Sequence, residues 1–167
     1  MTAVLARLRG VRATALVVPV PEVAGLAMPA EMPPHVTVAF PFDLAAVGPA
    51  RRSRLAALFQ QSPRFAFELF RLERFADATY LAPRDPEPFA ALVAAIAAAV
   101  PGYPLYGGRF PEYLPHVTVG PADGMDPART SALTAVLPIS GRADAVELWA
   151  LRRRRGWVRE DVFPLGT

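Results

Sequence analysis

Short apolar segments recur along the chain with the length and spacing of β-strands. The run Ala13–Val18 is too short for a secretion signal, and Pro19 and Pro21 cut it off, so it predicts a first strand. Further segments alternate apolar and polar residues or are rich in β-branched and aromatic residues. These strands are expected at Pro34–Val38, at Phe67–Leu72, from Ala78 onward, at Pro115–Val119, at Val146–Leu151 and at about Trp157–Leu165.

Three other segments have the apolar spacing of helices. Gly48–Leu58 and Asp126–Val136 both look like helix starts with a proline at the first helical position. A longer helix opens at Pro86, where Asp85 can cap it, and Pro101 stops it. The expected apolar faces are Leu55, Leu58 and Phe59 in the first helix, Leu133, Val136 and Leu137 in the second, and Phe89, Leu92, Val93, Ile96 and Val100 in the third. A short helix is also expected from Pro21-Glu22.

These elements recur in the same order, which indicates an internal duplication. Ala13–Ala27 parallels Ala78–Leu92, and Phe67–Leu72 parallels Val146–Leu151. The chain therefore predicts two repeats, about 13–75 and 78–151, followed by a final strand at about 157–165. The expected fold class is α+β, with duplicated β-α-β-α-β units that form a bilobal fold of largely antiparallel sheets around a central cleft. No polar linker divides the repeats, so residues 1–167 are expected to form a single bilobal domain.

Composition narrows the functional classes. The 167 residues are 53% hydrophobic and 20% charged, the balance of a globular protein. The absence of cysteine excludes disulfides, thiolate metal sites and thiol catalysis, and it fits a cytoplasmic protein. No apolar stretch is long enough to cross a membrane, and no feature implies a protein partner. The net charge of +3 favours the approach of a polyanion.

Both histidines of the chain lie in one repeated pentapeptide, PHVTV, at Pro34–Val38 and Pro115–Val119. In a strand, His35 and Thr37 point to one face, as do His116 and Thr118, while the valines point to the other. An approximate two-fold axis would bring the two His–Thr pairs into one groove. Hydroxyl and imidazole donors suit a phosphate, and two histidines on opposite sides of phosphorus can act as general base and general acid.

Three other interpretations of this pattern stay open. A strand histidine is often a structural residue with its hydrogen bonds satisfied. Two histidines could bind a metal, although neither motif supplies a carboxylate or a thiolate as a further ligand. Thr37, which lies beside His35, could act as a nucleophile rather than as a phosphate-binding hydroxyl.

The paired motifs resemble the H-x-T-x motifs of the 2H phosphoesterases, and the chain looks like a bacterial member of their 2′-5′ RNA ligase and cyclic phosphodiesterase branch. The segments Pro33–Phe42, Tyr113–Gly120 and Trp157–Gly166 are similar to that branch's first motif, second motif and last strand. The resemblance implies a bilobal fold, metal-independent chemistry without a cofactor, catalytic roles for His35 and His116, and phosphate binding by Thr37 and Thr118. Many members carry an arginine soon after the second motif. This chain has Gly120-Pro121 there, which leaves the further phosphate contacts unassigned.

The sequence therefore favours a phosphoesterase that hydrolyses 2′,3′-cyclic phosphates of RNA ends or nucleotides to 2′-phosphates, with 2′-5′ ligation as the reverse chemistry. The alternative is a module that binds RNA ends or nucleotides in the same pocket without turnover. A structural partner protein is a third interpretation, in which both histidines are buried away from any groove. The candidate substrate contacts are the aromatic residues Phe40, Phe42, Phe110 and Tyr113, which can stack on a base or belong to the core, and Arg109, which can reach a phosphate.

Overall fold

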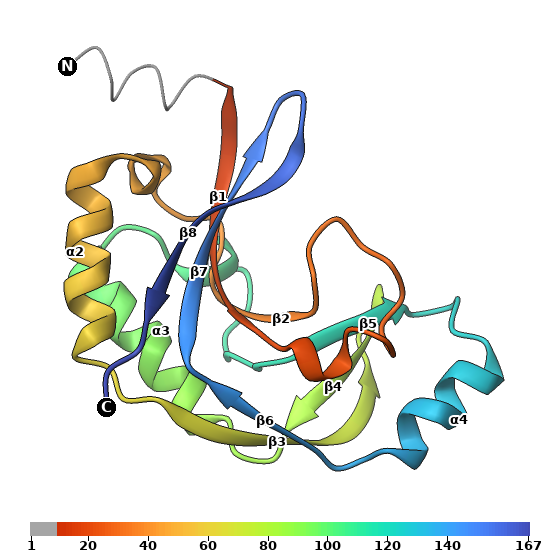
Figure 1. The fold of residues 1–167 in the computed structure, drawn as a ribbon. Coiled ribbons are helices and arrows are strands. Elements are labelled where there is room, and N and C mark those ends of the chain that lie inside the picture. The colour runs from red at the N-terminus through yellow and green to blue at the C-terminus, as the bar shows by residue number, and fades with distance from the viewer. Residues whose placement is uncertain (1–9) are drawn as a thin grey trace.

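A computed structural model describes residues 10–167, and its centre is one curled, eight-stranded antiparallel sheet (Figure 1). The strands are β1 (Val11–Pro19), β2 (His35–Ala39), β3 (Phe65–Arg74), β4 (Ala78–Pro83), β5 (Val117–Pro121), β6 (Ile139–Ala143), β7 (Ala145–Arg152) and β8 (Gly156–Pro164). Their order across the sheet is β6-β3-β4-β5-β2-β1-β7-β8. The predicted α+β class, with antiparallel strands in a bilobal arrangement, is confirmed.

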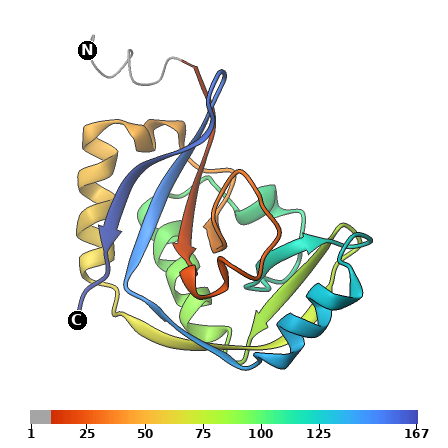
Figure 2. The same cartoon turned by 45° about the vertical axis from the view of Figure 1, so that its right-hand side comes forward.

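The two halves of the sheet meet at β2 and β5, the strands that carry the two histidine motifs. One half holds β1, β2, β7 and β8, and the other holds β3, β4, β5 and β6. The two halves exchange one strand each. The strand β3 precedes β4 in the chain but pairs with it in the second half of the sheet, and β7 comes late in the chain but pairs with β1 in the first half. Irregular register in β1, at Leu16/Val17, and in β4, at Thr79/Tyr80, accompanies the curl seen in Figure 2. The division into repeats at 13–75 and 78–151, and the single domain over 1–167, stay predictions.

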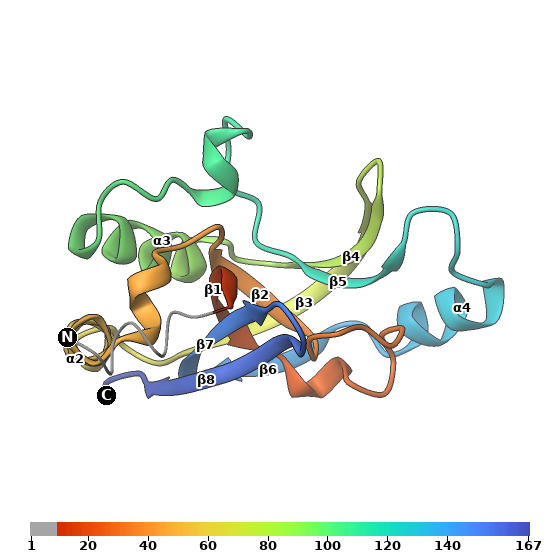
Figure 3. The ribbon, with the colours of Figure 1, turned by 90° about the horizontal axis from the view of Figure 1, so that it is seen from above.

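Helices cover one face and one end of the sheet. The helix α2 (Pro49–Gln60) packs beside α3 (Glu87–Ala99), whereas α4 (Pro127–Ala135) lies at the opposite end (Figure 3). Asp126 caps α4 by accepting a hydrogen bond from the Arg129 amide, and proline occupies the first turn of each of these helices. Within residues 10–167, three short 3-10 helices lie in the connections: η1 (Pro21–Val23), η2 (Leu44–Val47) and η3 (Leu105–Gly108). None of the helices in this described range is long and apolar enough to span a membrane.

The main core fills the space between the sheet and the helices. It contains the valines of both histidine motifs together with Leu55 and Phe59 of α2 and the buried face of α3. A smaller apolar cluster lies on the other face of the sheet: Ala15, Val17 and Trp149 are buried there, with Met32, Phe40 and Trp157 packed against them. The two histidine strands therefore have one face buried in the main core and an opposite face that carries the polar side chains of the motifs.

The structure differs from the sequence-based expectations at four points. The helix expected from Pro21 is a single 3-10 turn that ends at Val23. The helix α3 begins at Glu87 rather than Pro86, although Asp85 does accept a hydrogen bond from the Glu87 amide. Val136 lies just past the end of α4 and is 47% exposed, so it is not part of a buried face. The strand β6 was not expected, because the segment ISGRA has little apolar alternation.

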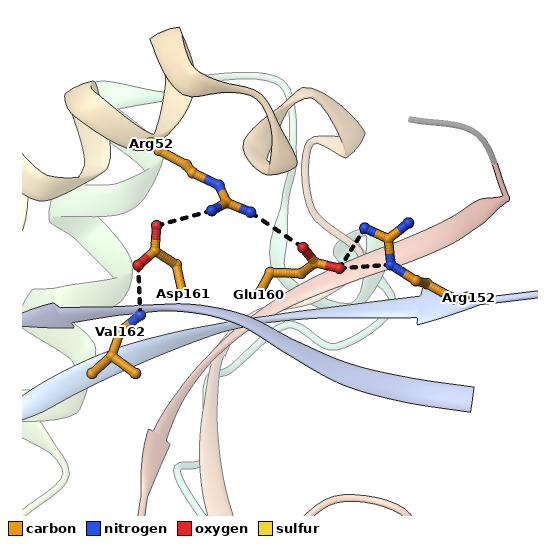
Figure 4. Close-up of polar contacts among 5 residues, drawn as sticks. All are labelled: Arg52, Arg152, Glu160, Asp161 and Val162. Carbon is orange, nitrogen blue, oxygen red and sulfur yellow. Dashed lines mark hydrogen bonds and ion pairs between the residues drawn. The ribbon is translucent and has the colours of Figure 1, made fainter. Parts of the chain in front are cut away.

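A network of charged residues holds α2 against the sheet. Arg52 of α2 reaches both Glu160 and Asp161 on β8, at 3.2 and 3.3 Å (Figure 4). Glu160 also accepts from Arg152 of β7 at 2.5 Å. Because most of these side chains are largely buried, the shared carboxylate links a helix and two strands on the side of the molecule away from the histidines.

Candidate active site

The register of β2 and β5 brings the two motifs together. Val36 pairs with Val117, and both are fully buried in the main core. In an antiparallel pair this register sets His35 opposite Thr118 and His116 opposite Thr37, all on the face turned away from that core. The two histidines are then diagonal neighbours, which lie about 7–8 Å apart in such a pair. An approximate two-fold axis runs through the Val36–Val117 pair.

Each imidazole is held by the same local hydrogen bond. His35 Nδ1 lies 2.8 Å from the carbonyl oxygen of Pro33, and His116 Nδ1 lies 2.8 Å from that of Leu114. A carbonyl oxygen only accepts, so Nδ1 carries the proton in both rings and Nε2 is left to exchange protons with a ligand. The prolines directly before the histidines fix an extended approach, which lets the ring reach back two residues.

Burial sets the acid–base properties of the pair. It lowers the pKa of His35 below its ordinary value of 6.5; the Pro33 carbonyl and, more weakly, Glu147 oppose the shift, while the charge of His116 adds to it. Burial likewise lowers the pKa of His116, opposed by the Leu114 carbonyl and the Asp77 carboxylate. The charge of one ring therefore disfavours a second charge on the other, which favours a state with one proton fewer than two full imidazolium ions.

Aromatic rings support His116. Its ring meets Phe75 at 5.0 Å and Tyr80 at 5.4 Å between centroids, both edge-on, and these two rings stack on each other at 4.0 Å. The Tyr80 hydroxyl donates to Glu73 at 2.8 Å. Burial and the Glu73 carboxylate raise the pKa of Tyr80 to about 12, so its phenol stays protonated. Neither Phe75 nor Tyr80 was expected from the sequence, since both lie far from His116 along the chain.

Two tyrosines converge on Thr37. The Tyr113 hydroxyl donates to the Thr37 carbonyl oxygen at 3.0 Å. Burial raises the pKa of Tyr106, and a hydrogen bond with the Thr37 side chain partly opposes that shift. Tyr106 is the one non-glycine residue among residues 10–167 with a positive φ, at 52°, in a turn that Gly107 and Gly108 continue. Sequence reasoning missed Tyr106; the Gly-Gly pair that follows it was the available signal of a tight turn.

Matching carboxylates flank the two motifs across the sheet. Val17 pairs with both Thr37 and Glu147, while Tyr80 pairs with both Thr118 and Glu73, so each glutamate lies two strands from a motif threonine. Glu147 accepts from Trp149 Nε1 at 2.8 Å and from Arg159 at 2.9 Å. Glu73 accepts from the Tyr80 hydroxyl and forms an ion pair with Arg71 at 2.5 Å. Each of the two glutamates therefore has the same kinds of partner, one aromatic hydrogen-bond donor and one arginine.

A pocket of about 780 Å³ opens beside one of the two motif pairs. His35 and Thr118 line it together, with Trp157 and residues of the segment 24–34, which connects β1 to β2. That segment docks on β5, because the Met28 amide donates to the Val119 carbonyl at 2.8 Å. A side chain at Gly120 would meet the Met28 and Met125 side chains at 2.8–3.1 Å, so the two methionines pack closely over this position.

The remaining candidate contacts differ in position. Phe40 is half-buried and meets Trp157 edge-on at 5.9 Å, in the small cluster on the histidine face. Phe42 is 3% exposed and belongs to the main core, so it is not a substrate contact. Tyr113 supports Thr37, as described above. Phe110 is 63% exposed and Arg109 is exposed, both in the loop after η3, and the structure gives neither a contact with the motif residues.

Among residues 10–167 no group of three or more histidine or acidic side chains is arranged to hold a metal ion. The motif face instead presents two imidazole Nε2 atoms and two hydroxyls. This arrangement can donate hydrogen bonds to an anion and can both take and give a proton.

Comparison with known proteins agrees with this geometry. Residues 6–156 match the model of the 2′-5′ RNA ligase superfamily. No curated protein sequence matches the chain significantly. Among solved structures, the fold resembles E. coli LigT complexed with 3′-AMP (TM-score 0.63, 14% identity, 94% of this chain and 99% of that one). It also resembles TT0787 of Thermus thermophilus (TM-score 0.64, 15% identity, 93% and 100%).

A third similar structure is Usb1 of Kluyveromyces marxianus, with a TM-score of 0.50, 12% identity, and coverage of 91% of this chain and 97% of that one. At such identities the structural likeness shows the fold, and the family model shows the relationship by sequence. The chain belongs to the 2′-5′ RNA ligase superfamily, a family of 2H phosphoesterases.

Proposed function

We propose that this protein hydrolyses 2′,3′-cyclic phosphates of RNA ends or nucleotides to 2′-phosphates, with His35 and His116 as the general acid and base. The observation that carries the proposal is the Val36–Val117 register, which sets each histidine opposite the threonine of the other motif. E. coli LigT has been solved with 3′-AMP, with ATP, with NADP⁺ and with phosphate, which supports a nucleotide ligand for the same fold.

The chemistry follows from placing phosphorus between the two Nε2 atoms. One neutral imidazole takes a proton from water as the water oxygen bonds to phosphorus. The P–O3′ bond breaks, and the other imidazole, protonated at the start, gives its proton to the leaving O3′. The product is a 2′-phosphate, and a 5′-hydroxyl in place of water would give a 2′-5′ linkage by the same step.

The two threonine hydroxyls would bind the non-bridging oxygens, whose charge changes during the displacement. Tyr113 donates to the backbone carbonyl of Thr37, which holds the main chain of the first motif in place beside the proposed phosphate site. The pairing of each threonine with the opposite histidine puts a donor and a proton carrier on each side of phosphorus.

The test is incubation with a 2′,3′-cyclic nucleotide and with an RNA oligomer that ends in a cyclic phosphate, followed by chromatography against 2′- and 3′-phosphate standards. We expect the 2′-phosphate, unchanged yield in excess EDTA, and a loss of about 10²–10⁴-fold in turnover for His35→Ala or His116→Ala. A 3′-phosphate product, or near-normal turnover in either variant, would reject the assignment. Binding of the product without any turnover would instead favour the alternative, a non-catalytic binding module.

A further inference from the structure

The pocket beside His35 and Thr118 has the location and chemistry of a site for the base of the nucleotide. Its volume, about 780 Å³, lies within the range of small-molecule sites. The segment 24–34 supplies alanine, proline and methionine side chains to its wall, including Met28 and Met32. A cyclic phosphate held between the motifs would project its nucleoside to one side of them, and on this side there is an apolar pocket to receive it.

Trp157 provides a flat aromatic wall. It lies at the start of β8, it is half-buried, and its ring packs against Phe40 in the small apolar cluster with centroids 5.9 Å apart. Stacking of a base on an aromatic side chain is favourable for every base, so Trp157 accounts for binding but not for selection.

Among the residues that the structure describes, Glu31 is the only ionisable side chain that lines the pocket besides His35. Its carboxylate lies against the start of β8, because a Cβ atom added to Gly156 would come within 3.3 Å of Glu31 Oε2. Within residues 10–167 the Glu31 carboxylate has no hydrogen bond and no ion pair. Beside Trp157 there is therefore an unpaired acceptor that can meet the edge of a stacked base.

We propose that this pocket selects guanine, with the base stacked on Trp157 and its N1–H and N2–H groups donating to the Glu31 carboxylate. A carboxylate only accepts, and guanine is the one common base whose Watson–Crick edge presents two adjacent donors. Adenine and cytosine place a lone pair beside their amino group, and uracil flanks its single N–H with two carbonyl oxygens, so each sets an acceptor against the carboxylate. The inference rests on the proposed function for the position of the phosphate.

Binding of nucleoside 2′-monophosphates, measured by titration calorimetry, tests the proposal without requiring turnover. We expect 2′-GMP to bind about 10–100-fold more tightly than 2′-AMP, the discrimination that one bidentate contact provides. Glu31→Gln should remove that preference and shift it toward adenine, because an amide can donate to N1 and accept from N6. The matched control is Glu22→Gln in η1, an exposed glutamate of the same connection that does not line the pocket, and it should keep the wild-type preference.

Trp157→Ala should weaken the binding of both purine nucleotides by a similar factor, and Trp157→Phe should retain most of it. Equal affinity for 2′-GMP and 2′-AMP, no binding of either, or an unchanged preference in Glu31→Gln would overturn the proposal. Hydrolysis of the four 2′,3′-cyclic nucleotides separates the two claims. Turnover without guanine preference rejects the base site alone, whereas guanine-selective binding without turnover rejects the proposed function alone.

Discussion

At the scale of single residues, the proposed mechanism needs two imidazoles that share an environment but hold different numbers of protons. Each ring donates Nδ1–H to a backbone carbonyl two residues before it, so neither is distinguished by its own hydrogen bond. Their acidic neighbours differ, since Glu147 acts on His35 and Asp77 acts on His116. The proposed mechanism places one proton on the pair, so the pH profile of the activity tests it.

The rate should depend on pH in a bell-shaped manner, with its maximum on the acid side. The base must be neutral, so kcat/KM rises as pH passes its pKa, and the acid must be charged, so kcat/KM falls above its pKa. Burial lowers both values in the free enzyme, which places the centre of the kcat/KM profile below pH 6.5. A bound phosphate anion stabilises the charged rings, so the kcat profile should lie at higher pH.

Asp77→Asn gives a matched variant for this prediction. The Asp77 carboxylate raises the pKa of His116, so its removal should move the kcat/KM profile further toward acid. The measurement is initial rate against pH at low substrate. A profile centred above neutral pH in the wild type would contradict the pKa directions.

Thr37→Val tests the role of the motif hydroxyls. Valine keeps the shape of threonine and removes the donor, so we expect an unchanged fold and a decrease in kcat/KM of roughly 10–1000-fold. Thr118→Val should behave similarly. Thr134→Val is the control, because that hydroxyl donates only to the Thr130 carbonyl within α4 and should leave the kinetics unaltered. A Thr37→Val enzyme with full activity would exclude the hydroxyl from phosphate binding.

At the scale of the elements, the sequence predicted the histidine strands well because the information is local. The alternation in PHVTV specifies which side chains share a face, and the burial of Val36 and Val117 agrees with it. The similarity between Ala13–Ala27 and Ala78–Leu92 predicted the strands β1 and β4 and the helix α3, but not the short 3-10 turn that follows β1, and its alignment is shifted relative to the strand pairing. The sequence alignment matches Leu16 with Leu81. In the sheet, however, Val18 pairs with Val36 and Leu81 pairs with Val117, so the residue of β1 that corresponds to Leu81 is Val18. Irregular pairing within β1 and β4 changes which residues of neighbouring strands lie opposite each other, and the amino-acid sequence gives no sign of it.

Other parts of the fold could not be predicted because they depend on distant contacts. The strand β6 is held by pairing with β3, and Gly141 is required there because a Cβ atom would lie 2.4 Å from the Phe67 ring. Tyr106 comes close to Thr37 because η3 packs against β2, which is distant from it along the chain. The position of α2 depends in part on ion pairs more than a hundred residues apart in sequence, as between Arg52 and Glu160.

Glu160→Gln should destabilise the protein through the network that holds α2. The carboxylate binds Arg52 and Arg152 at once and is 14% exposed, so its neutralisation removes one ion pair from each arginine, although Arg52 keeps its ion pair with Asp161. We expect a decrease of about 1–3 kcal/mol in the free energy of unfolding, measured by urea titration, with kcat preserved. Arg142→Gln is the comparison, since its ion pair with Asp144 is exposed and should contribute about 0–1 kcal/mol. Equal effects of the two changes would show that the network contributes nothing beyond a surface pair.

At the scale of the whole molecule, the exchange of inner strands binds the two halves of the sheet into one unit. The strand β3 belongs to the first half of the chain but lies between β4 and β6 of the second, and β7 belongs to the second half but pairs with β1 of the first. The direct pairing of the two lobes is confined to Val36 and Val117 in the part of the chain that the structure describes, so the exchanged strands are the main links between them. The cleft geometry therefore depends on both halves being folded together.

This topology predicts that neither half of the chain folds by itself. A fragment of residues 1–76 lacks the partners of β3, and a fragment of residues 77–167 lacks the neighbours of β4, β5, β6 and β7 that β1, β2 and β3 supply. Each fragment should show no cooperative urea transition, because unpaired strand edges and half of a shared core do not offset the loss of conformational entropy.

The intact protein should unfold in one transition, with far-ultraviolet circular dichroism and the fluorescence of Trp149 and Trp157 changing together. Trp149 and Trp157 both lie in one half of the sheet, so a lobe that unfolded separately would make the two signals diverge. Such divergence, or a cooperative transition in either fragment, would show that the halves are independent and that the cleft is a joint between two domains.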